Sequence, residues 1–364
     1  MKIPKTPLLA LLSLIPLTLS ELQEAEVNGM FVFGSSLVDN GNNNFLKNAT
    51  TKANFHPYGV DFPLGPSGRF SNGRNAIDVL GGLLKLPRLI PPFTDPRTRG
   101  ARVVHGVNFA SGGSGILDQT GSFRGEVMSL SQQIRDFKVT TLPQLRTQLR
   151  CVHSPRLFED HLSNYLFVVG TGGNDYLQYF VSKEKDKVTV PVFTESLIST
   201  LSRQLKSLVQ IKGKAWLKIK TVSLIIEASQ LPRLILLNFF TNEAALLCNS
   251  HLKSLARSSN DQMPDSKMVF VDSYKIIRDI IDNPVDNGFS DTSKPCCEVS
   301  TPAEGGNGVL CKRNGRACEN RRGHVYFDGL HPTEAVNVRI ARKAYDGSDV
   351  EEAYPTNVKK LARL

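Results

Sequence analysis

The chain of 364 residues is predicted to adopt an α/β fold, a three-layer α/β/α sandwich in which helices cover both faces of a parallel sheet. Two observations lead to this prediction. Short apolar runs of strand length alternate along the chain with longer stretches of helical periodicity. Several of the apolar runs also end in polar, glycine-rich stretches, which is typical of the edge of an open α/β sheet where ligands bind.

The N-terminal half begins with a strand and a long irregular segment. The run 30–33 is short and apolar and ends at Gly34, as a buried strand does before a turn. Residues 39–75 are dense in Asn, Gly and Pro, which predicts an irregular surface loop. The further elements expected in this half are a helix over 76–86, a strand over 103–109 and an amphipathic helix over 132–149 interrupted at Pro143.

The C-terminal half continues the alternation of strands and helices. The clearest buried strand, 165–169, runs directly into the polar stretch 170–175. Leucines at helical spacing predict a helix over 193–211, whose apolar face belongs to the core. The remaining elements are a strand over 268–271, an apolar run at 325–327 and a last helix over 332–345, opened by Pro332 in the position where its missing N–H is tolerated.

The first twenty residues have the pattern of a secretory signal. Lys2 and Lys5 precede an apolar run over 9–19 that is too short to span a bilayer, and cleavage is expected near Ser20 or a few residues later. The alternative, a buried N-terminal helix, is disfavoured because Pro7 and Pro16 would interrupt it. No later segment approaches the roughly 20 apolar residues of a transmembrane helix, so a soluble, secreted product is expected.

The basic residues do not indicate a nucleic-acid partner. The formal net charge is +10, but Lys and Arg are dispersed and form no run of five. A solvated basic face is the simpler interpretation. Weak attraction to acidic wall polymers or anionic surfaces stays open as an alternative.

Six cysteines in a secreted chain predict disulfides. Two local bridges are expected among the four cysteines that lie close together in a Gly- and Pro-rich segment, with their connectivity open. A zinc site is the rival, but the spacing has no C-x-x-C pair. Asn48 begins the single glycosylation sequon. The four clustered cysteines are Cys296, Cys297, Cys311 and Cys318, while Cys151 and Cys248 either pair together or stay buried as thiols.

Three residues are candidates for ester cleavage through a serine, which needs a hydroxyl, an imidazole that takes its proton and a carboxylate that orients the imidazole. Ser36 follows a predicted strand and stands at a turn, where its hydroxyl can act as the nucleophile. Asp328 and His331 are three residues apart, which on a tight turn brings both side chains to one side of the backbone. Asp328 can then hold one ring nitrogen of His331 and leave the other to face Ser36.

Donors for the developing oxyanion also have candidates. Asn174 is delivered by the strand that ends at residue 169, and its side chain can donate. Gly113, or its neighbours Gly112 and Gly115, can offer a backbone N–H, because glycine lets a backbone approach a substrate closely. The Ser36 amide completes the set. Taken one at a time, these stretches have plainer interpretations as turns and, for Asp328, as a helix cap.

Taken together and in this order, the stretches resemble the GDSL esterase/lipase family, the plant branch of the SGNH hydrolases. The resemblance covers about residues 28–345. The matching stretches are 33–43 (FGSSLVDNGNN), 57–59 (PYG), 68–74 (GRFSNGR), 106–113 (GVNFASGG), 173–176 (GNDY) and 331–333 (HPT).

The resemblance implies the site and the reaction. By position it implies Ser36 as nucleophile, His331 as base, Asp328 as its orienter, and Ser36, Gly113 and Asn174 as oxyanion donors. It also implies a flavodoxin-like sheet, no metal or organic cofactor, and substrates that are carboxylic esters of lipids or of acylated small molecules and polymers. A single hydrolase domain over 28–345 followed by a C-terminal tail over 346–364 is expected, located in the cell wall or apoplast.

The sequence departs from the family pattern at three places. Ser35 stands where the family has Asp, and Phe327 stands where it usually has Trp. Residues 211–240 lack the Gly-Ala-Arg, apolar strand and Pro-x-Gly-Cys that the family has there, so a core strand at this place stays open. Two alternative functions follow: an acyltransferase with the same triad, or a catalytically impaired, wall-associated binding protein.

Overall fold

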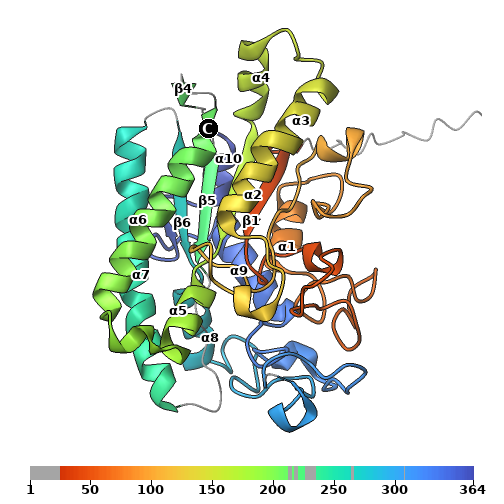
Figure 1. The fold of residues 1–364 in the computed structure, drawn as a ribbon, viewed down its shortest axis with the longest axis vertical. Coiled ribbons are helices and arrows are strands. Elements are labelled where there is room, and N and C mark those ends of the chain that lie inside the picture. Colours follow the sequence, from red (N-terminus) through yellow and green to blue (C-terminus); the bar gives the residue numbers. More distant parts are fainter. Residues whose placement is uncertain (1–24, 212–214, 217–219, 226–234, 264–265, 307) are drawn as a thin grey trace, which may run out of the picture.

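The computed structural model describes residues 25–211, 215–216, 220–225, 235–263, 266–306 and 308–364 (Figure 1). The expected signal sequence over 1–20 lies outside these residues. Within the described ranges, no helix has the length and apolar character needed to cross a membrane. The irregular loop 39–75 and the segment 291–332 lie side by side at one end of the sheet, where Arg321 pairs with Asp61 (Figure 1).

A five-stranded sheet forms the centre of the described structure, in the order β1-β2-β5-β6-β7. The first four strands run parallel to their neighbours, and β7 runs antiparallel to β6. The α/β prediction with a mostly parallel sheet is confirmed. The strands are β1 (Gly29–Gly34), β2 (Tyr165–Gly170), β5 (Lys220–Ile225), β6 (Lys267–Asp272) and β7 (Ala353–Tyr354), and a separate antiparallel pair joins β3 (Gln210–Ile211) to β4 (Ala215–Trp216).

Several helices begin at side chains that satisfy their first backbone donors. In the clearest case the Asn75 side chain accepts from the amide of Asp78, whose carboxylate accepts in return from the amide of Asn75. The helices are α1 (Ala76–Leu83), α2 (Leu130–Asp136), α3 (Leu142–Gln148), α4 (Pro155–Leu162), α5 (Gly173–Val181), α6 (Val190–Val209), α7 (Ile235–Gln262), α8 (Ser273–Asp282), α9 (Glu334–Asp346) and α10 (Val358–Ala362).

Both faces of the sheet are covered by buried apolar side chains, because alternate residues of a strand point to opposite faces. Phe31 and Phe33 of β1 belong to one buried cluster, together with side chains of α2, α3, α4, α6 and α7. Met30 and Val32 of the same strand belong to a second cluster with α1, α8, α9 and α10. The strands therefore stand between two separate cores.

Most of the predicted elements are present, with corrected boundaries. The strands expected at 30–33, 165–169 and 268–271 are β1, β2 and β6. The helix expected over 132–149 is broken earlier than Pro143, by a π-helical turn at Phe137–Thr141. Pro143 instead stands in the first turn of α3, where a missing N–H leaves no hydrogen bond unmade.

The start of the last helix is also corrected. Pro332 does not open α9; it precedes the helix and pairs with Tyr326 in an isolated bridge. Thr333 is the N-cap residue and Glu334 the first helical residue. The proline is compatible with the residues before a helix, since its ring favours extended geometry in the residue that precedes it.

The prediction of a regular strand over 103–109 is wrong. Residues Gly100–Val103 form a 3-10 turn, and the following residues run beside β1 without forming a regular strand. The amide of Met30 donates to His105 O, and the amide of Phe109 donates to Val32 O. Gly106 has φ 102°, and a Cβ there would lie 1.9 Å from the Met30 oxygen, so the chain kinks where it approaches β1.

The prediction that 39–75 is a surface loop is half wrong. The segment is irregular, but many of its polar side chains are buried. The Asn42 side chain donates to Asn108 O and Ala110 O, and the Asn43 side chain donates to Gly112 O. These side-chain amides satisfy the backbone as a sheet would, and thereby allow a loop rich in Asn and Gly to be packed inside the molecule.

Two segments with weak sequence signals complete the sheet. β5 comes from the irregular segment 211–240 and pairs with β2 on one side and β6 on the other. β7 and α10 come from the residues expected as a C-terminal tail, and the Ala362 carbonyl accepts a hydrogen bond from the Lys220 ammonium at 2.8 Å. The end of the described chain therefore contacts the middle of the sheet.

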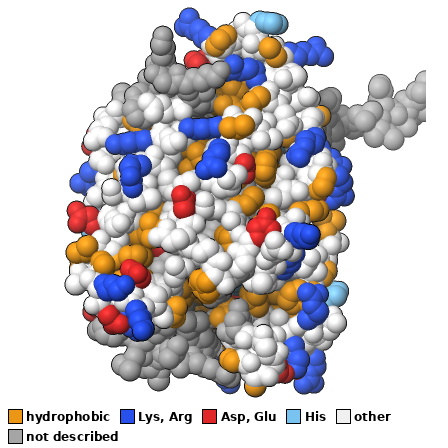
Figure 2. Space-filling model, viewed as in Figure 1, with side chains coloured by type: hydrophobic (Ala, Val, Ile, Leu, Met, Phe, Trp, Pro, Cys, Tyr) orange, Lys and Arg blue, Asp and Glu red, His pale blue; other side chains and the backbone are white. Residues whose placement is uncertain are grey.

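Charged side chains are scattered on the face of the molecule shown in Figure 2. Lys and Arg side chains are spread among Asp and Glu, with apolar side chains between them. The distribution on this face agrees with the dispersed basic residues of the sequence.

Candidate active site

Ser36 stands in the turn that follows β1. Gly34, the last residue of that strand, has φ 139°, and a Cβ there would lie 2.0 Å from the Gly170 oxygen at the end of β2. Only glycine fits so close to a neighbouring backbone. The turn that carries Ser36 is thus held against the edge of the sheet where β1 and β2 end.

Asp328 and His331 occupy a tight turn before α9. The carboxylate of Asp328 accepts from the backbone amides of Leu330 and His331, at 2.8 and 2.7 Å. The imidazole Nδ1 of His331 lies 2.8 Å from the second carboxylate oxygen of Asp328. The side chain of Asp328 is fully buried, and His331 is 2% exposed.

The structure brings these residues together with Ser36, although 295 residues separate Ser36 from His331 along the chain. The His331 Nε2 lies 2.8 Å from the Ser36 hydroxyl oxygen. The imidazole of His331 therefore lies between the two other side chains, with Nδ1 facing the Asp328 carboxylate and Nε2 facing the Ser36 hydroxyl. With Nδ1 protonated toward Asp328, the free Nε2 is able to accept the serine proton.

Aromatic side chains enclose the imidazole. The ring of Phe70 lies 4.8 Å from the ring of His331, between centroids. Phe327, which replaces the family's tryptophan, is fully buried and meets Tyr58 edge-on in a small cluster that includes three of the disulfide cysteines. The apolar wall beside Asp328 is kept despite the substitution.

Tyr58 is a site residue to which the sequence analysis gave no role. It is fully buried, and its hydroxyl donates to the Asp328 Oδ2 at 2.5 Å. The hydroxyl oxygen of Tyr58 in turn accepts from the backbone amide of Cys311 at 3.1 Å. Tyr58 lies in the stretch 57–59, and 270 residues separate it from Asp328, so no local pattern indicates the contact.

Asn174, one of the expected oxyanion donors, is joined through Ser114 to Gly34, just before the turn that carries Ser36. The hydroxyl of Ser114 donates to Gly34 O at 2.7 Å, and the side chain of Asn174 donates to Ser114 O at 2.9 Å. Asn174 lies in the first turn of α5 and is half-buried. One of its two amide protons is used by Ser114, which leaves the other for a ligand.

The three candidate glycines differ in their surroundings. The Gly112 amide already donates to Asp39 and Asn43 at 3.1 Å, and Gly115 packs against the Asp175 carboxylate. Gly113 has φ 92°, and its amide, like that of Ser36, donates to no protein group in the described part of the chain. Of the three, Gly113 therefore has the backbone donor that stays available.

Two buried carboxylates hold the loops around the site. Asp39 accepts from the amides of Gly41, Asn42 and Gly112, and burial raises its pKa to about 6 despite these bonds. Asp175 accepts from two amides and the hydroxyl of Thr120, and burial raises its pKa as well. Asp39 lies within the stretch 33–43 and Asp175 within 173–176, and these stretches are the signal in the sequence that marks them.

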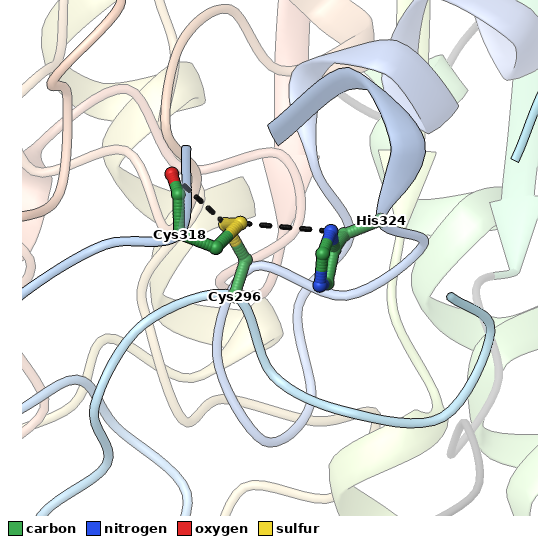
Figure 3. Close-up of side chains that lie close together, drawn as sticks. All are labelled: Cys296, Cys318 and His324. Carbon is green, nitrogen blue, oxygen red and sulfur yellow. Dashed lines mark hydrogen bonds between the residues drawn. A yellow bond between two sulfur atoms is a disulfide. The ribbon is translucent and has the colours of Figure 1, made fainter. Parts of the chain in front are cut away.

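The four clustered cysteines form two disulfides, Cys296–Cys318 and Cys297–Cys311. The two predicted bridges are confirmed, and the connectivity is now known. Cys296, Cys318 and His324 lie close together (Figure 3), with the His324 Nδ1 3.5 Å from the sulfur of Cys318. The zinc alternative fails at this cluster, because a thiolate ligand set is not available from sulfurs bonded to each other. Cys151 and Cys248 are buried, and neither takes part in the disulfides found among the described residues.

Ser35 lies beside the end of β2. Its hydroxyl points to the Gly170 carbonyl at 3.5 Å, and the residue is buried. A weak hydrogen bond to this carbonyl thus stands where the family's Asp would be. The Ser36 and His331 geometry is formed in the presence of Ser35.

Comparison with known proteins relates the chain to one group of enzymes. The family model described as GDSL-like Lipase/Acylhydrolase matches residues 30–344. The chain is 37% identical to the GDSL esterase/lipase At1g71250 of Arabidopsis thaliana, over 94% of this chain and 90% of that protein. It is 34% identical to the GDSL esterase/lipase At1g29670 of the same plant, over 94% and 93% of the two chains. The similarity extends across the sheet, the loops and both sides of the site.

Proposed function

This chain belongs to the GDSL-like lipase/acylhydrolase family and is a carboxylic ester hydrolase, and we propose that it is a secreted serine hydrolase that acts through Ser36, His331 and Asp328. The observation that carries this proposal is the in-line arrangement of the three side chains. The Ser36 hydroxyl is 2.8 Å from Nε2 of His331, and Nδ1 of the same ring is 2.8 Å from Asp328.

The proposed acylation step uses each group once. His331 takes the Ser36 proton on Nε2 while the hydroxyl oxygen attacks the ester carbonyl carbon, and the carbonyl π electrons move to oxygen. Collapse of the tetrahedral intermediate breaks the bond to the leaving alkoxide, which receives the proton from His331. Asp328 stays ionised and stabilises the imidazolium that forms between these steps.

Deacylation repeats the sequence with water as the nucleophile. Water gives a proton to His331 Nε2 and attacks the acyl-enzyme, and Ser36 leaves with that proton restored to its oxygen. The products are the carboxylic acid and the alcohol. An acceptor alcohol in place of water would give the acyltransferase reaction, and new esters formed from added alcohols would identify it.

The amides of Ser36 and Gly113 and the side chain of Asn174 are the proposed donors to the oxyanion. Their support is that the two amides have no protein acceptor within the described residues, and that Asn174 has a second proton to give. Removal of one such donor typically lowers turnover about 100- to 1000-fold. Asn174→Ala is expected to lower kcat by this factor, measured with a chromogenic ester.

The finer assignments of fold and location belong to the same proposal. We propose a three-layer α/β/α sandwich with a flavodoxin-like sheet, supported by the two buried clusters on opposite faces of the strands. The proposed domain spans 28–345 after a signal over 1–20, and residues 346–364, which follow it, add β7 and α10 to its sheet and core. The substrates proposed are esters of lipids or of acylated small molecules and polymers, and the location is the cell wall or apoplast.

Ser36→Ala tests the proposal directly. The variant should lose hydrolysis of p-nitrophenyl butyrate while its circular dichroism spectrum stays that of the parent, because only the nucleophilic oxygen is removed. Ser35→Ala is the matched control, and it should retain activity within about 10-fold because its hydroxyl makes only a weak bond to a carbonyl. A fluorophosphonate should label the parent and Ser35→Ala but not Ser36→Ala. Parent-like turnover by Ser36→Ala would overturn the assignment.

A further inference from the structure

We propose that Tyr58 is a positioning residue, which holds the Asp328 carboxylate in the orientation that serves His331, and that the Cys297–Cys311 disulfide holds Tyr58 in place. This inference rests on the proposed function, since the orientation of Asp328 affects turnover only if His331 acts as the base. It adds a residue from the loop 39–75 and a covalent bond to the machinery of the site.

The carboxylate of Asp328 is fixed mainly by its own turn. Oδ1 accepts from the amides of Leu330 and His331, and Oδ2 lies 2.8 Å from the His331 Nδ1. Within the described residues, the Tyr58 hydroxyl is the donor to this carboxylate that comes from outside the turn, at 2.5 Å from Oδ2. It therefore fixes the carboxylate relative to the rest of the protein rather than relative to its own backbone.

Tyr58 is well suited to a permanent donor role. Its side chain is fully buried between Phe55, Phe70 and Phe327, which meet it edge-on with centroids 5.3 to 6.0 Å away. Burial, with the charge of Asp328 next, raises the pKa of Tyr58 well above its usual value of 10.0. The hydroxyl therefore keeps its proton at every pH at which an esterase works, and the ring cannot swing away without displacing its neighbours.

The second contact of the hydroxyl leads to the disulfide. The Cys311 amide donates to the Tyr58 oxygen at 3.1 Å, which directs the hydroxyl proton toward Asp328. Cys311 is bonded to Cys297, whose amide donates at 2.8 Å to the carbonyl of Phe327, the residue before Asp328. The contacts form a closed ring from Asp328 through Tyr58, Cys311, Cys297 and Phe327 back to Asp328.

The other disulfide serves as an internal comparison. Cys296–Cys318 joins the same segment, and its sulfur lies near the imidazole of His324 (Figure 3). Its hydrogen bonds run to Tyr326 and within the cysteine-rich segment, and none of those found among the described residues reaches Tyr58. The two bridges are thus neighbours in sequence that differ in whether they hold Tyr58.

Tyr58→Phe is the first test, because it removes one oxygen and keeps the ring. A hydrogen bond to a charged group corresponds to about a 10- to 100-fold change in an equilibrium or rate. We expect kcat for p-nitrophenyl butyrate to fall by about this factor, with KM changed less than about 2-fold because Tyr58 lies behind Asp328 and away from Ser36. Active sites are counted by fluorophosphonate titration, so that misfolded protein does not enter kcat.

A coupling measurement separates positioning from general structural support. Tyr58→Phe should add little further loss in an Asp328→Asn background, because the hydroxyl then has no carboxylate to orient. A purely structural role predicts losses that multiply, and multiplied losses would reject the proposal.

Two double variants, each lacking one disulfide, test whether Cys297–Cys311 holds Tyr58 in place. Cys297→Ala with Cys311→Ala should lower kcat about as much as Tyr58→Phe, whereas Cys296→Ala with Cys318→Ala should leave kcat within about 2-fold of the parent. Equal losses from the two pairs would refute the role assigned to Cys297–Cys311. Tyr58→Phe keeps both bridges, so it decides the first half even where a pair variant does not fold.

The proposal and the proposed function fail in different ways. If Ser36→Ala is inactive and Tyr58→Phe has a parent-like kcat, the positioning role is wrong and the triad stands. If Ser36→Ala is active, the proposed function is wrong, and any effect of Tyr58→Phe loses the meaning given to it here.

Discussion

The two sides of the active site are held in place by different kinds of interaction. On the serine side, Ser36 follows a strand of the sheet, and the loops around it are joined by buried side chains such as Asp39 and Asn43. On the histidine side, His331 follows the irregular segment 291–332, which is joined by two disulfides and exposed ion pairs. Uncharged and charged hydrogen bonds hold the loops around Ser36, the proposed nucleophile, while covalent bonds hold the segment that leads to His331, the proposed base.

The difference shows how an irregular segment can be made rigid in two ways. A loop that packs against a large core can be fixed by polar side chains, because burial makes an unmade hydrogen bond costly. A segment with only a small apolar cluster of its own buries too few groups to be held in this way. A disulfide stabilises it instead, because the bond restricts its unfolded state. The activity should therefore be sensitive, on the histidine side, to loss of Cys297–Cys311, and the stability should be sensitive, on the serine side, to loss of buried charges.

The largest expected effect comes from removal of the Asp328 carboxylate on the histidine side. Asp328→Asn should lower kcat about 10,000-fold, because the amide cannot hold the imidazole in the tautomer that leaves Nε2 free. Hydrolysis of p-nitrophenyl butyrate measures the loss, and slower labelling by a fluorophosphonate should accompany it. A fall of less than about 10-fold would remove Asp328 from the site.

A large effect on stability is expected from the serine side at its buried ion pair. Arg69 donates to both carboxylate oxygens of Asp78, at 2.6 and 2.7 Å, and both side chains are nearly inaccessible. Arg69→Ala leaves the charge of Asp78 buried without its partner, which typically costs about 3–5 kcal/mol. Urea denaturation of parent and variant measures the difference in free energy of unfolding. A change below about 1 kcal/mol would show that the pair does not support the loop.

A pH dependence follows from Asp39, also on the serine side. Burial raises the pKa of Asp39 from 3.8 to about 6, so the folded protein binds this proton more tightly than the unfolded chain. The stabilisation from this group is complete below about pH 4 and is lost as the pH rises through about 6, a change of about 3 kcal/mol.

Asp39→Asn removes the titrating carboxyl group. The difference in stability between parent and variant therefore isolates the pH dependence due to Asp39 from that of the other ionisable groups. The free energy of unfolding of the parent, relative to the variant, should fall by about 3 kcal/mol between pH 4 and pH 7. Urea denaturation at the two pH values gives the comparison. A relative stability that does not change with pH would contradict the shift assigned to Asp39.

The smallest effect sharpens the contrast between the two sides. Arg316 pairs with Glu298 at 2.9 Å on the histidine side, but the Arg316 side chain is 91% exposed. Solvent screens such a pair, so Arg316→Ala should change the free energy of unfolding by less than about 1 kcal/mol. It serves as the matched control for Arg69→Ala in the same urea experiment. Equal losses from the two arginines would mean that burial does not distinguish the two sides.

Local patterns in the sequence predict three of the five strands in the described sheet and mark the proposed catalytic residues. The strands at 30–33, 165–169 and 268–271 are continuous apolar runs. Such short runs are typical of parallel strands that are buried on both faces. Ser36, Asp328 and His331 stand in short motifs at strand ends and turns, and the structure brings the three side chains into contact.

Long-range contacts account for what the sequence analysis missed. The composition of 39–75 is that of a surface loop, and its burial depends on bonds from Asn42 and Asn43 to residues more than 60 positions away. The run 103–109 has apolar residues of a strand, but Gly106 kinks it against β1. Tyr58 reaches Asp328 across 270 residues, and a local pattern carries no information about such a contact.

The contact between Lys220 and Ala362 sets an order for synthesis. Lys220 begins the central strand β5 and is 9% exposed, and its ammonium donates to the carbonyl of Ala362, 142 residues later in the chain. While the ribosome still encloses residues 353–362, this ammonium lacks its Ala362 acceptor and β6 lacks β7 beside it. The sheet is therefore completed only once residues 353–362 have left the ribosome, and a nascent chain stalled before residue 353 should remain sensitive to protease.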